Sequence, residues 1–322
     1  MKKLGFGAMR LPQIEADGQW VIDMETTKKM FDAYLAAGFT YFDTAYMYHG
    51  GKSETTLREL VVKRYPRDAF TITDKLPLSN KPGADELEGI FNEQLARCGV
   101  DYFDYYWLHN VNRQNYEHAE KVGAFGFIQQ KKAAGKTKHI GFSYHDTAEL
   151  LDEILTAHPE VEYVQLQINY LDWEDEKIQS RKCYEVCVKH QKPVIVMEPV
   201  KGGNLVKLPD VAKQVFEDLH GGSPASYAIR FAAGFPGILM VLSGMSDIKQ
   251  MKDNISFMQN FQPLTDAEME AVHKVQDIFR FMHRIACTAC RCCTDGCPQQ
   301  LPIRELLEQV AAELKKKEEP ET

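Results

Sequence analysis

The stretch Phe103–His109, FDYYWLH, is a short aromatic run that ends in a polar residue. A helical pattern follows it along the chain, over Ala119–Ala134. Short apolar runs of this kind are typical of strands that are buried on both faces of a parallel sheet. One strand and the helix after it form a βα unit, and the number of such units decides between the parallel folds.

The same unit recurs along most of the chain. Eight runs are expected to be strands: Leu4–Met9, Tyr41–Thr44, Phe70–Lys75, Phe103–His109, His139–Ser143, Tyr163–Asn169, Val194–Glu198 and Leu239–Ser243. Further helical patterns cover Thr26–Ala37, Ala84–Cys98, Thr147–Ala157, Glu176–His190 and Ser223–Ala233. Eight units favour a closed (β/α)8 barrel, the TIM barrel, over an open doubly wound sheet, and no GxGxxG fingerprint follows any of these strands.

Two domains are expected. The barrel takes residues 1–280, including a hairpin at Asp17 and Gly18 and a helix over Thr265–Phe281 that opens with a capping box to Glu268. Residues 281–322 form a short ferredoxin-like segment with clustered cysteines, a final helix over Ile303–Lys317 and a charged tail.

The composition is that of an ordinary globular protein. The chain has 322 residues, of which 44% are hydrophobic and 26% charged, and its formal net charge is −8. Nucleic acid and anionic membrane surfaces need a basic footprint, so neither is expected as a partner. The longest apolar run, Gly237–Met245, is far shorter than the roughly 20 residues of a membrane helix, and Arg10 interrupts the start before a signal-peptide core forms. We expect a cytoplasmic protein.

Polar residues stand where three successive strands end. Asp43, Lys75 and His109 lie at the ends of the second, third and fourth expected strands, and Tyr48 lies in the loop five residues after Asp43. Because active sites of (β/α)8 barrels lie at the carboxyl ends of the strands, these side chains are expected to meet. Each has a structural interpretation when taken alone, as a strand-end ion pair, a core histidine or a loop tyrosine.

Together the four residues form a coherent acid/base set. A phenol has an ordinary pKa of about 10, and a nearby ammonium lowers that pKa by stabilising phenolate. We therefore expect Tyr48 to be a general acid with a lowered pKa, Lys75 to tune it, and Asp43 to hold the ammonium. A neutral imidazole of His109 would orient a carbonyl oxygen, so the set suits reduction of a C=O group.

The runs FDTAYMYHGGKSE, TDK and WLH, together with LGFGAMRLP near the start, resemble the aldo-keto reductases over about residues 1–280. The resemblance implies that Asp43, Tyr48, Lys75 and His109 are the catalytic tetrad. It also implies a nicotinamide cofactor, NADP(H) or NAD(H), that binds in extended form across the barrel rim. We expect an NAD(P)H-dependent oxidoreductase that reduces an aldehyde or ketone to an alcohol.

Four more segments, IGFSYHD, VQLQINY, MEPVKGG and LSGMSDIKQMKDN, resemble cofactor-binding segments of that family. The positions that the resemblance assigns to the cofactor are Ser143, Tyr144, Gln165, Met197, Glu198, Pro199, Val200, Gly244, Met245, Gln250, Asp253 and Asn254. Ser143 and Gln165 are implied for the carboxamide, and Met197 replaces an aromatic residue that stacks on the nicotinamide. Gly244 and Gln250 stand where NADPH-specific relatives carry Lys and Arg, which leaves the choice between NADPH and NADH open. The cations near enough in sequence to compensate are Lys201, Lys249 and Lys252.

Five of the eight cysteines gather near the C-terminus. Cys287, Cys290, Cys293 and Cys297 have the C-x2-C-x2-C-x3-C-P spacing of a bacterial four-iron four-sulfur (4Fe-4S) run. A cytosolic compartment keeps thiols reduced, which favours metal over disulfides. Zinc and free thiols are the alternatives. Because the chain has one such run, we expect the fourth ligand to be Cys297 or a substitute thiol. Cys292 is the nearest in sequence, and Cys98, Cys183 and Cys187 would serve only if the fold brings them close.

The cluster has two interpretations. The favoured one is structural, because a metal cluster stabilises a tail too small to fold alone; the other is an electron relay to a redox partner. For the whole chain, the alternatives to a carbonyl reductase are a cofactor-sensing regulatory subunit and an electron-transfer protein. The expected substrate is a small carbonyl compound, in a pocket with Tyr46, His49, Tyr144, His145 and Trp173 as expected lining residues.

Overall fold

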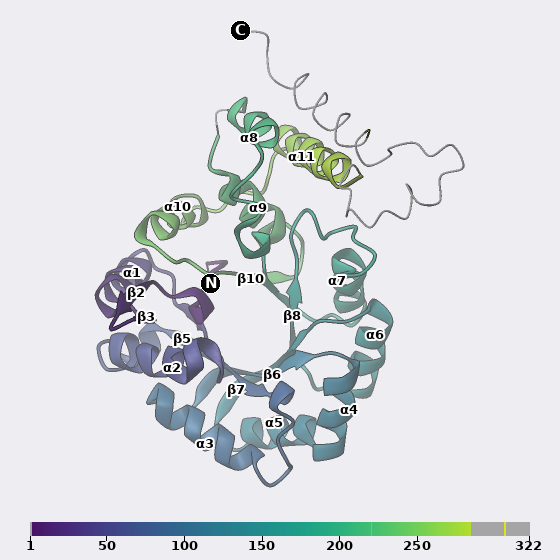
Figure 1. Ribbon diagram of the computed structural model, residues 1–322. Helices are drawn as coiled ribbons and strands as arrows, with labels where there is room; N and C mark the ends of the chain where they lie inside the picture. The colour runs from purple at the N-terminus through teal and green to yellow at the C-terminus, as the bar shows by residue number, and fades with distance from the viewer. Residues whose placement is uncertain (1, 220, 285–305, 307–322) are drawn as a thin grey trace. The chain divides into compact units, whose positions relative to one another are not determined.

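The computed structural model describes residues 2–219, 221–284 and 306 of the chain (Figure 1). The chain divides into two compact units. The larger unit consists of Met1–Val206 and Gly222–Leu264, and it contains the strands of the described residues. The smaller unit consists of Lys207–Gly221 and Thr265–Thr322.

The larger unit is built on a closed barrel of eight parallel strands. These strands are β1 (Leu4–Gly7), β4 (Tyr41–Asp43), β5 (Thr71–Pro77), β6 (Phe103–Val111), β7 (Thr137–Tyr144), β8 (Tyr163–Gln167), β9 (Val194–Met197) and β10 (Ile238–Ser243). Each strand pairs with the next along the chain, and the barrel closes where Leu4 of β1 lies opposite Val241 of β10. The predicted (β/α)8 barrel and its eight predicted strands are confirmed.

Side chains from several strands fill the inside of the barrel. Tyr41 of β4, Trp107 of β6 and Met240 of β10 belong to one buried cluster. Gly141 of β7 makes room for it, because a Cβ at that position would lie 2.4 Å from Trp107 Cζ3 and 2.3 Å from the carbonyl oxygen of Tyr163. The barrel interior is therefore a packed core, and space for a ligand is left at the rim.

The helices of the larger unit are α1 (Met24–Ala36), α2 (Lys52–Leu57), α3 (Leu87–Cys98), α4 (Arg113–Val122), α5 (Ala124–Ala133), α6 (Ala148–Ala157), α7 (Ser180–Lys189), α9 (Pro224–Ala233) and α10 (Ile248–Met258). Figure 1 shows them arranged around the strands. Buried side chains tie them to the barrel: the hydroxyl of Tyr34 in α1 lies 2.7 Å from the carbonyl oxygen of Leu4 and 2.9 Å from that of Tyr41.

Residues with positive φ explain why the structure confirms the predicted hairpin and why it divides one predicted helix. The hairpin at Asp17 and Gly18 is confirmed as β2 (Gln13–Ala16) and β3 (Gln19–Ile22), and both turn residues have positive φ. The pattern over Ala119–Ala134 predicts one helix, but the structure has α4 and α5. They meet at Gly123, whose φ of 70° is left-handed and interrupts the helix.

The smaller unit contains α8 (Asp210–Glu217) and α11 (Asp266–Arg284), which pack against each other. The predicted capping box opens α11: the Thr265 N–H donates to Glu268 Oε2 at 2.8 Å, and the Glu268 N–H donates to Thr265 Oγ1 at 3.3 Å. The cysteine run Cys287–Cys297 and, apart from Leu306, the helix expected over Ile303–Lys317 lie outside the described residues. The predicted division after residue 280 stays a prediction.

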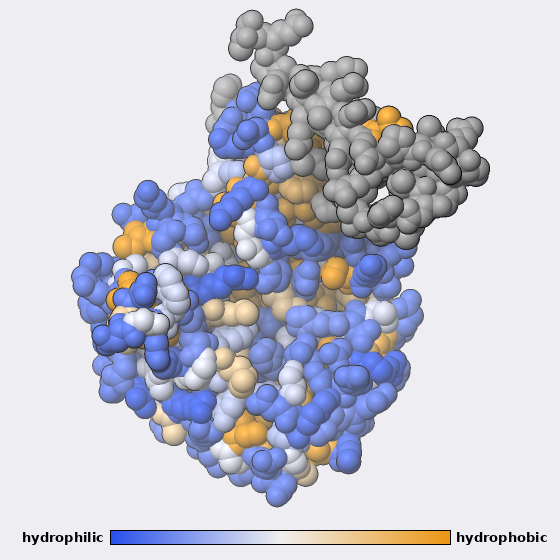
Figure 2. Space-filling view, viewed as in Figure 1, coloured by the Kyte–Doolittle hydropathy of each residue, from blue (hydrophilic) through white to orange (hydrophobic). Residues whose placement is uncertain are grey.

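The surface matches the charged composition of the chain. Figure 2 shows that hydrophilic residues dominate the visible face and that hydrophobic ones are scattered among them. Within residues 2–219 and 221–284, every helix is too short or too polar to cross a bilayer.

Candidate active site

A cavity of about 580 Å³ opens at the carboxyl ends of the barrel strands. Each of the eight strands contributes a residue to its wall, from the strand end or from the loop that follows. Asp43, Tyr48 and His109 line the cavity, and Lys75 lies directly behind Asp43. The structure therefore brings together the four residues that strand order predicts to meet.

Lys75 and Asp43 form a buried ion pair beneath the cavity. Lys75 Nζ donates to Asp43 Oδ1 at 2.6 Å and to the carbonyl oxygen of Thr44 at 2.6 Å. Strand register explains the contact: Asp43 lies opposite Thr73 of β5, and Lys75 is two residues further on the same face. The side chains of Lys75 and Asp43 are 1% and 4% exposed.

The electrostatics of this pair keep the amine charged. Burial raises the pKa of Asp43, and the Lys75 ammonium offsets part of that rise. Burial alone would lower the pKa of Lys75, but the negative charge of Asp43 and other neighbouring groups outweigh burial, so the Lys75 pKa is raised. A positive charge is thus fixed under the floor of the cavity.

Tyr48 opens a short 3₁₀ turn, Tyr48–Gly51, between β4 and α2. Its hydroxyl oxygen lies 3.5 Å from Lys75 Nζ. The predicted lowering of the Tyr48 pKa is wrong. Burial raises that pKa above its ordinary value, and the Lys75 charge offsets only part of the rise. The order of the strands predicts that a charged Lys75 lies near Tyr48, but it does not predict how deeply Tyr48 is buried.

His109 faces Tyr48 across the cavity. The two ring centroids are 5.9 Å apart, and the rings meet edge to face. Burial lowers the pKa of His109 to about 3, and the charge of Lys75 adds to this lowering. The imidazole is therefore neutral at neutral pH and can donate a hydrogen bond from one ring nitrogen.

Five of the expected cofactor residues line the same cavity: Ser143, Gln165, Met197, Glu198 and Gly244. Ser143 Oγ accepts the backbone N–H of Asn110 at 2.8 Å, which directs its own hydroxyl proton elsewhere. The Gln165 side chain acts on Asp43 and offsets a small part of the rise that burial causes in the pKa of that carboxyl. A hydroxyl, an amide and the apolar side chain of Met197 are the groups that suit a nicotinamide ring with its carboxamide.

The other expected cofactor residues lie outside the lining of this cavity. The hydroxyl of Tyr144 donates to the carbonyl oxygen of Thr147 at 2.5 Å, and Tyr144 lines a separate cavity of about 90 Å³. Gln250 lies in the first turn of α10, where Asp247 is the N-cap; its side chain donates to Asp247 Oδ2 and accepts the backbone N–H of Ser246. The rest of this group are Pro199, Val200, Met245, Asp253 and Asn254. An extended cofactor reaches beyond one cavity, so their roles stay predictions.

Some lining residues were missed by the sequence analysis. Arg10, Asn80 and Asn110 belong to the cavity wall. Arg10 lies against Gly244, where an added Cβ would be 3.2 Å from the Arg10 Cδ. All three lie at or just beyond the end of a strand, so the strand-end rule would find them when applied to every strand.

The expected substrate-lining residues divide in two. His49 and His145 line the cavity. Tyr46 instead donates its hydroxyl to Glu93 Oε2 at 2.8 Å, and Trp173 stacks on Phe235 with ring centroids 4.3 Å apart. Tyr144, as described above, belongs to the smaller cavity.

The fold defines the class as a (β/α)8-barrel protein with a cavity at the carboxyl ends of its strands, above a buried Lys–Asp pair. The comparison of sequences makes the assignment specific. The chain belongs to the aldo/keto reductase family, whose model matches residues 3–277, and it is an NAD(P)H-dependent oxidoreductase.

Individual relatives share about a quarter of their residues with this chain. It is similar to the aldo-keto reductase str7 of Strobilurus tenacellus, with 24% identity over 315 residues that cover 86% of this chain and 89% of that protein. An aldo-keto reductase of Mycobacterium avium is 25% identical over 265 residues, covering 80% and 84%.

Solved structures share the fold. The aldo-keto reductase AKR11C1 from Bacillus halodurans in its holo form has a TM-score of 0.68 and 21% identity, covering 85% of this chain and 91% of that chain. An aldo-keto reductase from Klebsiella pneumoniae in complex with NADPH has a TM-score of 0.65 and 19% identity, covering 85% and 90%.

Proposed function

We propose that this chain reduces an aldehyde or ketone to an alcohol, with Asp43, Tyr48, Lys75 and His109 as its catalytic tetrad. The observation that carries the proposal is the position of Tyr48 and His109 at one cavity, above the buried Lys75–Asp43 pair. Two neutral hydrogen-bond donors that face the same space suit a carbonyl oxygen, on which negative charge develops during reduction.

The roles follow from the charge of each group. The substrate oxygen binds between the Tyr48 hydroxyl and the N–H of His109. Bound NAD(P)H supplies the hydride for the carbonyl carbon. Tyr48 donates its proton to the oxygen, and the Lys75 ammonium stabilises the phenolate that remains. The raised pKa of Tyr48 supports this order, because the phenol keeps its proton until the substrate oxygen becomes the stronger base.

For the cofactor, we propose that the nicotinamide contacts Ser143, Gln165 and Met197, and that the positions from Gly244 to Asn254 receive the phosphates and adenosine. The start of α10 supports the second part, since a helix N-terminus favours anionic groups. The Klebsiella pneumoniae relative was solved with NADPH, which favours NADP(H) here. Exposed Lys249 and Lys252 of α10 supply positive charge that Gln250 lacks.

We also propose that the C-terminal run holds a 4Fe-4S cluster with a structural role. Its support is the ligand spacing of Cys287, Cys290, Cys293 and Cys297. The three cysteines of the barrel are buried, and burial raises the pKa of each thiol, so they are poor competing ligands. These three are Cys98, Cys183 and Cys187.

An anaerobic visible spectrum of the purified protein, with iron and sulfide analysis, tests the cluster. A broad visible band that NADPH leaves unchanged is the expected result. Bleaching by NADPH would contradict the structural role and indicate an electron relay. Zinc in place of iron would contradict the cluster itself.

Deuteride transfer tests the reaction. With NADPH deuterated at C4 and a panel of aldehydes and ketones, we expect deuterium on the carbinol carbon and one cofactor oxidised per alcohol formed. Tyr48→Phe should lower kcat by about 10²–10⁴-fold, the usual contribution of a general acid, while NADPH still binds in a fluorescence titration. Tight NADPH binding by the wild type without turnover of any carbonyl would instead identify a cofactor-sensing subunit.

A further inference from the structure

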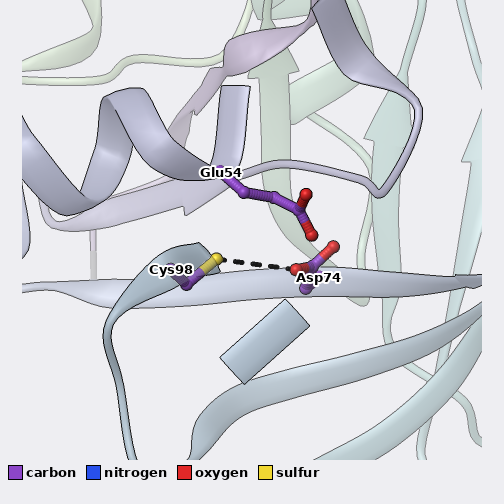
Figure 3. A group of neighbouring side chains, drawn as sticks. All are labelled: Glu54, Asp74 and Cys98. Carbon is purple, nitrogen blue, oxygen red and sulfur yellow. Dashed lines mark hydrogen bonds between the residues drawn. The ribbon is translucent and has the colours of Figure 1, made fainter. Parts of the chain in front are cut away.

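Three buried groups lie together behind β5, where the proposed reaction does not use them. Glu54 of α2, Asp74 of β5 and Cys98 at the end of α3 each place a polar atom within 4.8 Å of the others (Figure 3). All three residues are fully buried. Asp74 directly precedes Lys75, and neighbouring residues of a strand face opposite sides, so the cluster lies on the far side of β5 from the active site.

The hydrogen bonds of the two carboxyl groups leave one oxygen without a donor. Asp74 Oδ1 accepts the N–H of Lys75 at 2.8 Å, and Asp74 Oδ2 accepts from the thiol of Cys98 at 3.6 Å. Glu54 Oε2 accepts from Arg97 Nη1 at 3.1 Å. Among the described residues, none donates to the buried Glu54 Oε1, and Figure 3 shows the Glu54 carboxyl directed toward Asp74.

We propose that Glu54 and Asp74 share one proton, which Glu54 donates to the carboxylate of Asp74, and that this bond positions Tyr48 relative to Lys75. Two carboxylates this close in a buried site repel each other and have lost their hydration, so one of them must hold a proton. That proton also gives Glu54 Oε1 the hydrogen bond that it otherwise lacks.

The pKa values of the two groups support this division. Burial raises the pKa of Glu54 to about 9, and the charge of Asp74 adds to the rise. Burial also raises the pKa of Asp74, to about 6, although the hydrogen bonds that Asp74 accepts lower it in part. Between these two values the pair carries a single negative charge, which resides on Asp74.

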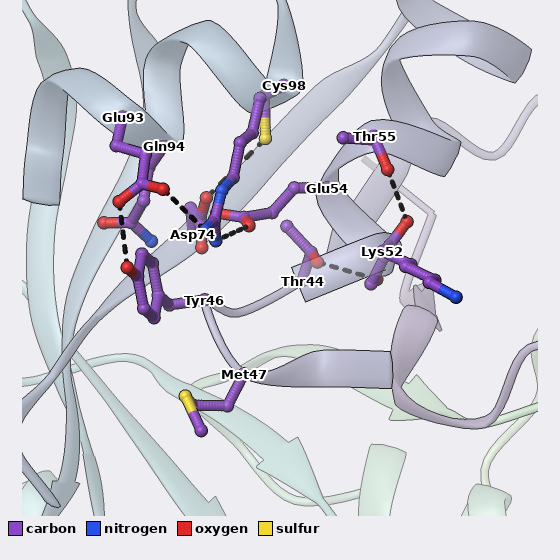
Figure 4. A network of polar contacts seen from close by, with 12 residues as sticks. Thr44, Tyr46, Met47, Lys52, Glu54, Thr55, Asp74, Glu93, Gln94 and Cys98 are labelled. Atoms are coloured by element: carbon purple, nitrogen blue, oxygen red, sulfur yellow. Dashed lines mark hydrogen bonds and ion pairs between the residues drawn. The ribbon is translucent and has the colours of Figure 1, made fainter. Parts of the chain in front are cut away.

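Figure 4 shows the polar side chains around the pair, among them Glu93 and Tyr46. Arg97 is the cation that faces Glu54. Its Nη2 also lies 2.6 Å from Glu93 Oε1, and its Cζ lies 4.4 Å from the centroid of the Tyr46 ring. It is therefore shared between two carboxyl groups. The remaining titratable groups that act on the cluster are Lys75 of β5, Arg58 of the π turn Arg58–Val62, and Tyr106 of β6.

The pair connects the two elements that carry the proposed proton donor and its tuning group. Tyr48 lies four residues before the start of α2, and Glu54 anchors α2 against β5. Next to Glu54, Ser53 bonds to Thr44 Oγ1 at 2.8 Å, and the carbonyl oxygen of Thr44 accepts from Lys75 Nζ.

The backbone of Lys75 is held from both sides. Asp74 accepts the Lys75 N–H, and Gln94 Nε2 donates to the Lys75 carbonyl oxygen at 3.0 Å. Glu54 and Asp74 are thus positioning residues, which act on the reaction through Lys75 and Tyr48. Their effect on turnover rests on the proposed function, whereas the shared proton does not.

The shared proton makes the stability of the folded protein depend on pH in a predictable direction. The folded pair keeps a proton that the unfolded chain releases near pH 4. The stabilisation from that proton is therefore complete below about pH 4 and declines as pH rises toward the folded pKa of about 9. Above that pH two charges face each other, and their repulsion separates α2 from β5.

Thermal unfolding between pH 5 and 10 tests the proton without any assay of activity. Glu54→Gln keeps a donor toward Asp74 but cannot titrate, so its Tm should fall less with rising pH than that of the wild type. Glu93→Gln removes a carboxyl that also binds Arg97 but does not face Asp74, and it should follow the wild-type slope. Equal slopes for the wild type and Glu54→Gln would overturn the proposal.

Infrared spectroscopy gives a second readout at neutral pH. The wild type and Glu93→Gln should show the carbonyl stretch of a buried protonated carboxylic acid, and Glu54→Gln should lack it. Absence of the band in the wild type overturns the proposal. So does a divalent metal that is bound stoichiometrically by the wild type and lost specifically in Glu54→Gln.

Kinetics test the positioning role. Glu54→Leu should lower kcat/KM by roughly 10–100-fold, as expected when reacting groups are misplaced, with the Kd for NADPH unchanged. Glu54→Gln should restore most of this loss and move the alkaline fall in kcat/KM to higher pH. An equal loss in both variants would overturn the positioning role. Absence of turnover in the wild type would contradict the proposed function alone, since the Tm and infrared results decide the shared proton.

Discussion

The Nζ of Lys75 lies 3.5 Å from the hydroxyl oxygen of Tyr48, at the outer limit of a hydrogen bond. The same nitrogen is only 2.6 Å from Asp43 Oδ1. Lys75 therefore acts on the phenol mainly through its charge, while its hydrogen bonds are directed to Asp43 and the backbone. The phenol stays protonated in the free protein, and in the proposed reaction the ammonium would stabilise the phenolate that forms when the proton leaves.

The buried pair should show strong coupling in stability. Lys75→Met leaves the Asp43 carboxylate buried without its cation, so we expect the free energy of unfolding to fall by about 3–5 kcal/mol. Lys75→Met combined with Asp43→Asn should recover most of this stability and none of the turnover. Urea unfolding of both variants measures the effect. A double variant no more stable than Lys75→Met would contradict the coupling.

The pH dependence of the reaction should lack a histidine step. The pKa of His109 is lowered to about 3, so the imidazole is neutral through the range of about pH 5–8 where histidines ordinarily titrate. We expect kcat/KM for carbonyl reduction to show no acid-side fall in that range. Initial rates across it check this, and a wild-type break near pH 6.5 that is missing in His109→Gln would show that burial does not keep the ring neutral.

The hydrogen bond from His109 should matter more than its ring. His109→Gln retains an N–H donor of similar reach, whereas His109→Phe retains only a ring. We expect His109→Phe to lose about 10²–10⁴-fold in kcat/KM and His109→Gln to lose much less. Parallel titrations with NADPH serve as the control, because neither change removes an expected cofactor contact. Equal losses would assign His109 to packing.

The close packing inside the barrel gives a stability prediction. Gly141→Ala places a Cβ 2.3 Å from the carbonyl oxygen of Tyr163 and 2.4 Å from the ring of Trp107, so the barrel must shift. We expect a loss of about 1–3 kcal/mol. Gly126→Ala, in the exposed face of α5 with no atom near the new Cβ, should stabilise the protein by up to about 1 kcal/mol. Tm values of both variants provide the comparison.

Local patterns were sufficient to predict the barrel. Runs such as Val194–Met197 are apolar and β-branched, and a parallel strand buried on both faces needs those features at that length. Asp43, Lys75 and His109 were predictable for the same reason: each ends such a run, and parallel strands bring their carboxyl ends to one rim.

Features that depend on three-dimensional surroundings were not predictable. The raised pKa of Tyr48 comes from burial, which the charge of Lys75 offsets only in part. Tyr144 follows Ser143 in a segment expected to bind cofactor, yet its side chain turns to Thr147. Glu54 and Asp74 lie 20 residues apart in sequence, and only the packing of α2 on the barrel brings them into contact.

The circular order of the strands places the proposed proton-transfer residues and the proposed cofactor-binding residues on different arcs of the rim. Three consecutive strands, β4 to β6, carry Asp43, Lys75 and His109, whereas β7 to β10 carry the residues proposed to hold the cofactor. The two arcs meet at defined points, because Ser143 of β7 accepts the backbone N–H of Asn110 in β6 and the Gln165 side chain of β8 acts on Asp43. The loops after β9 and β10 lie outside these contacts, so if they hold the nucleotide as proposed, they are the place to alter its preference while Tyr48 stays where it is.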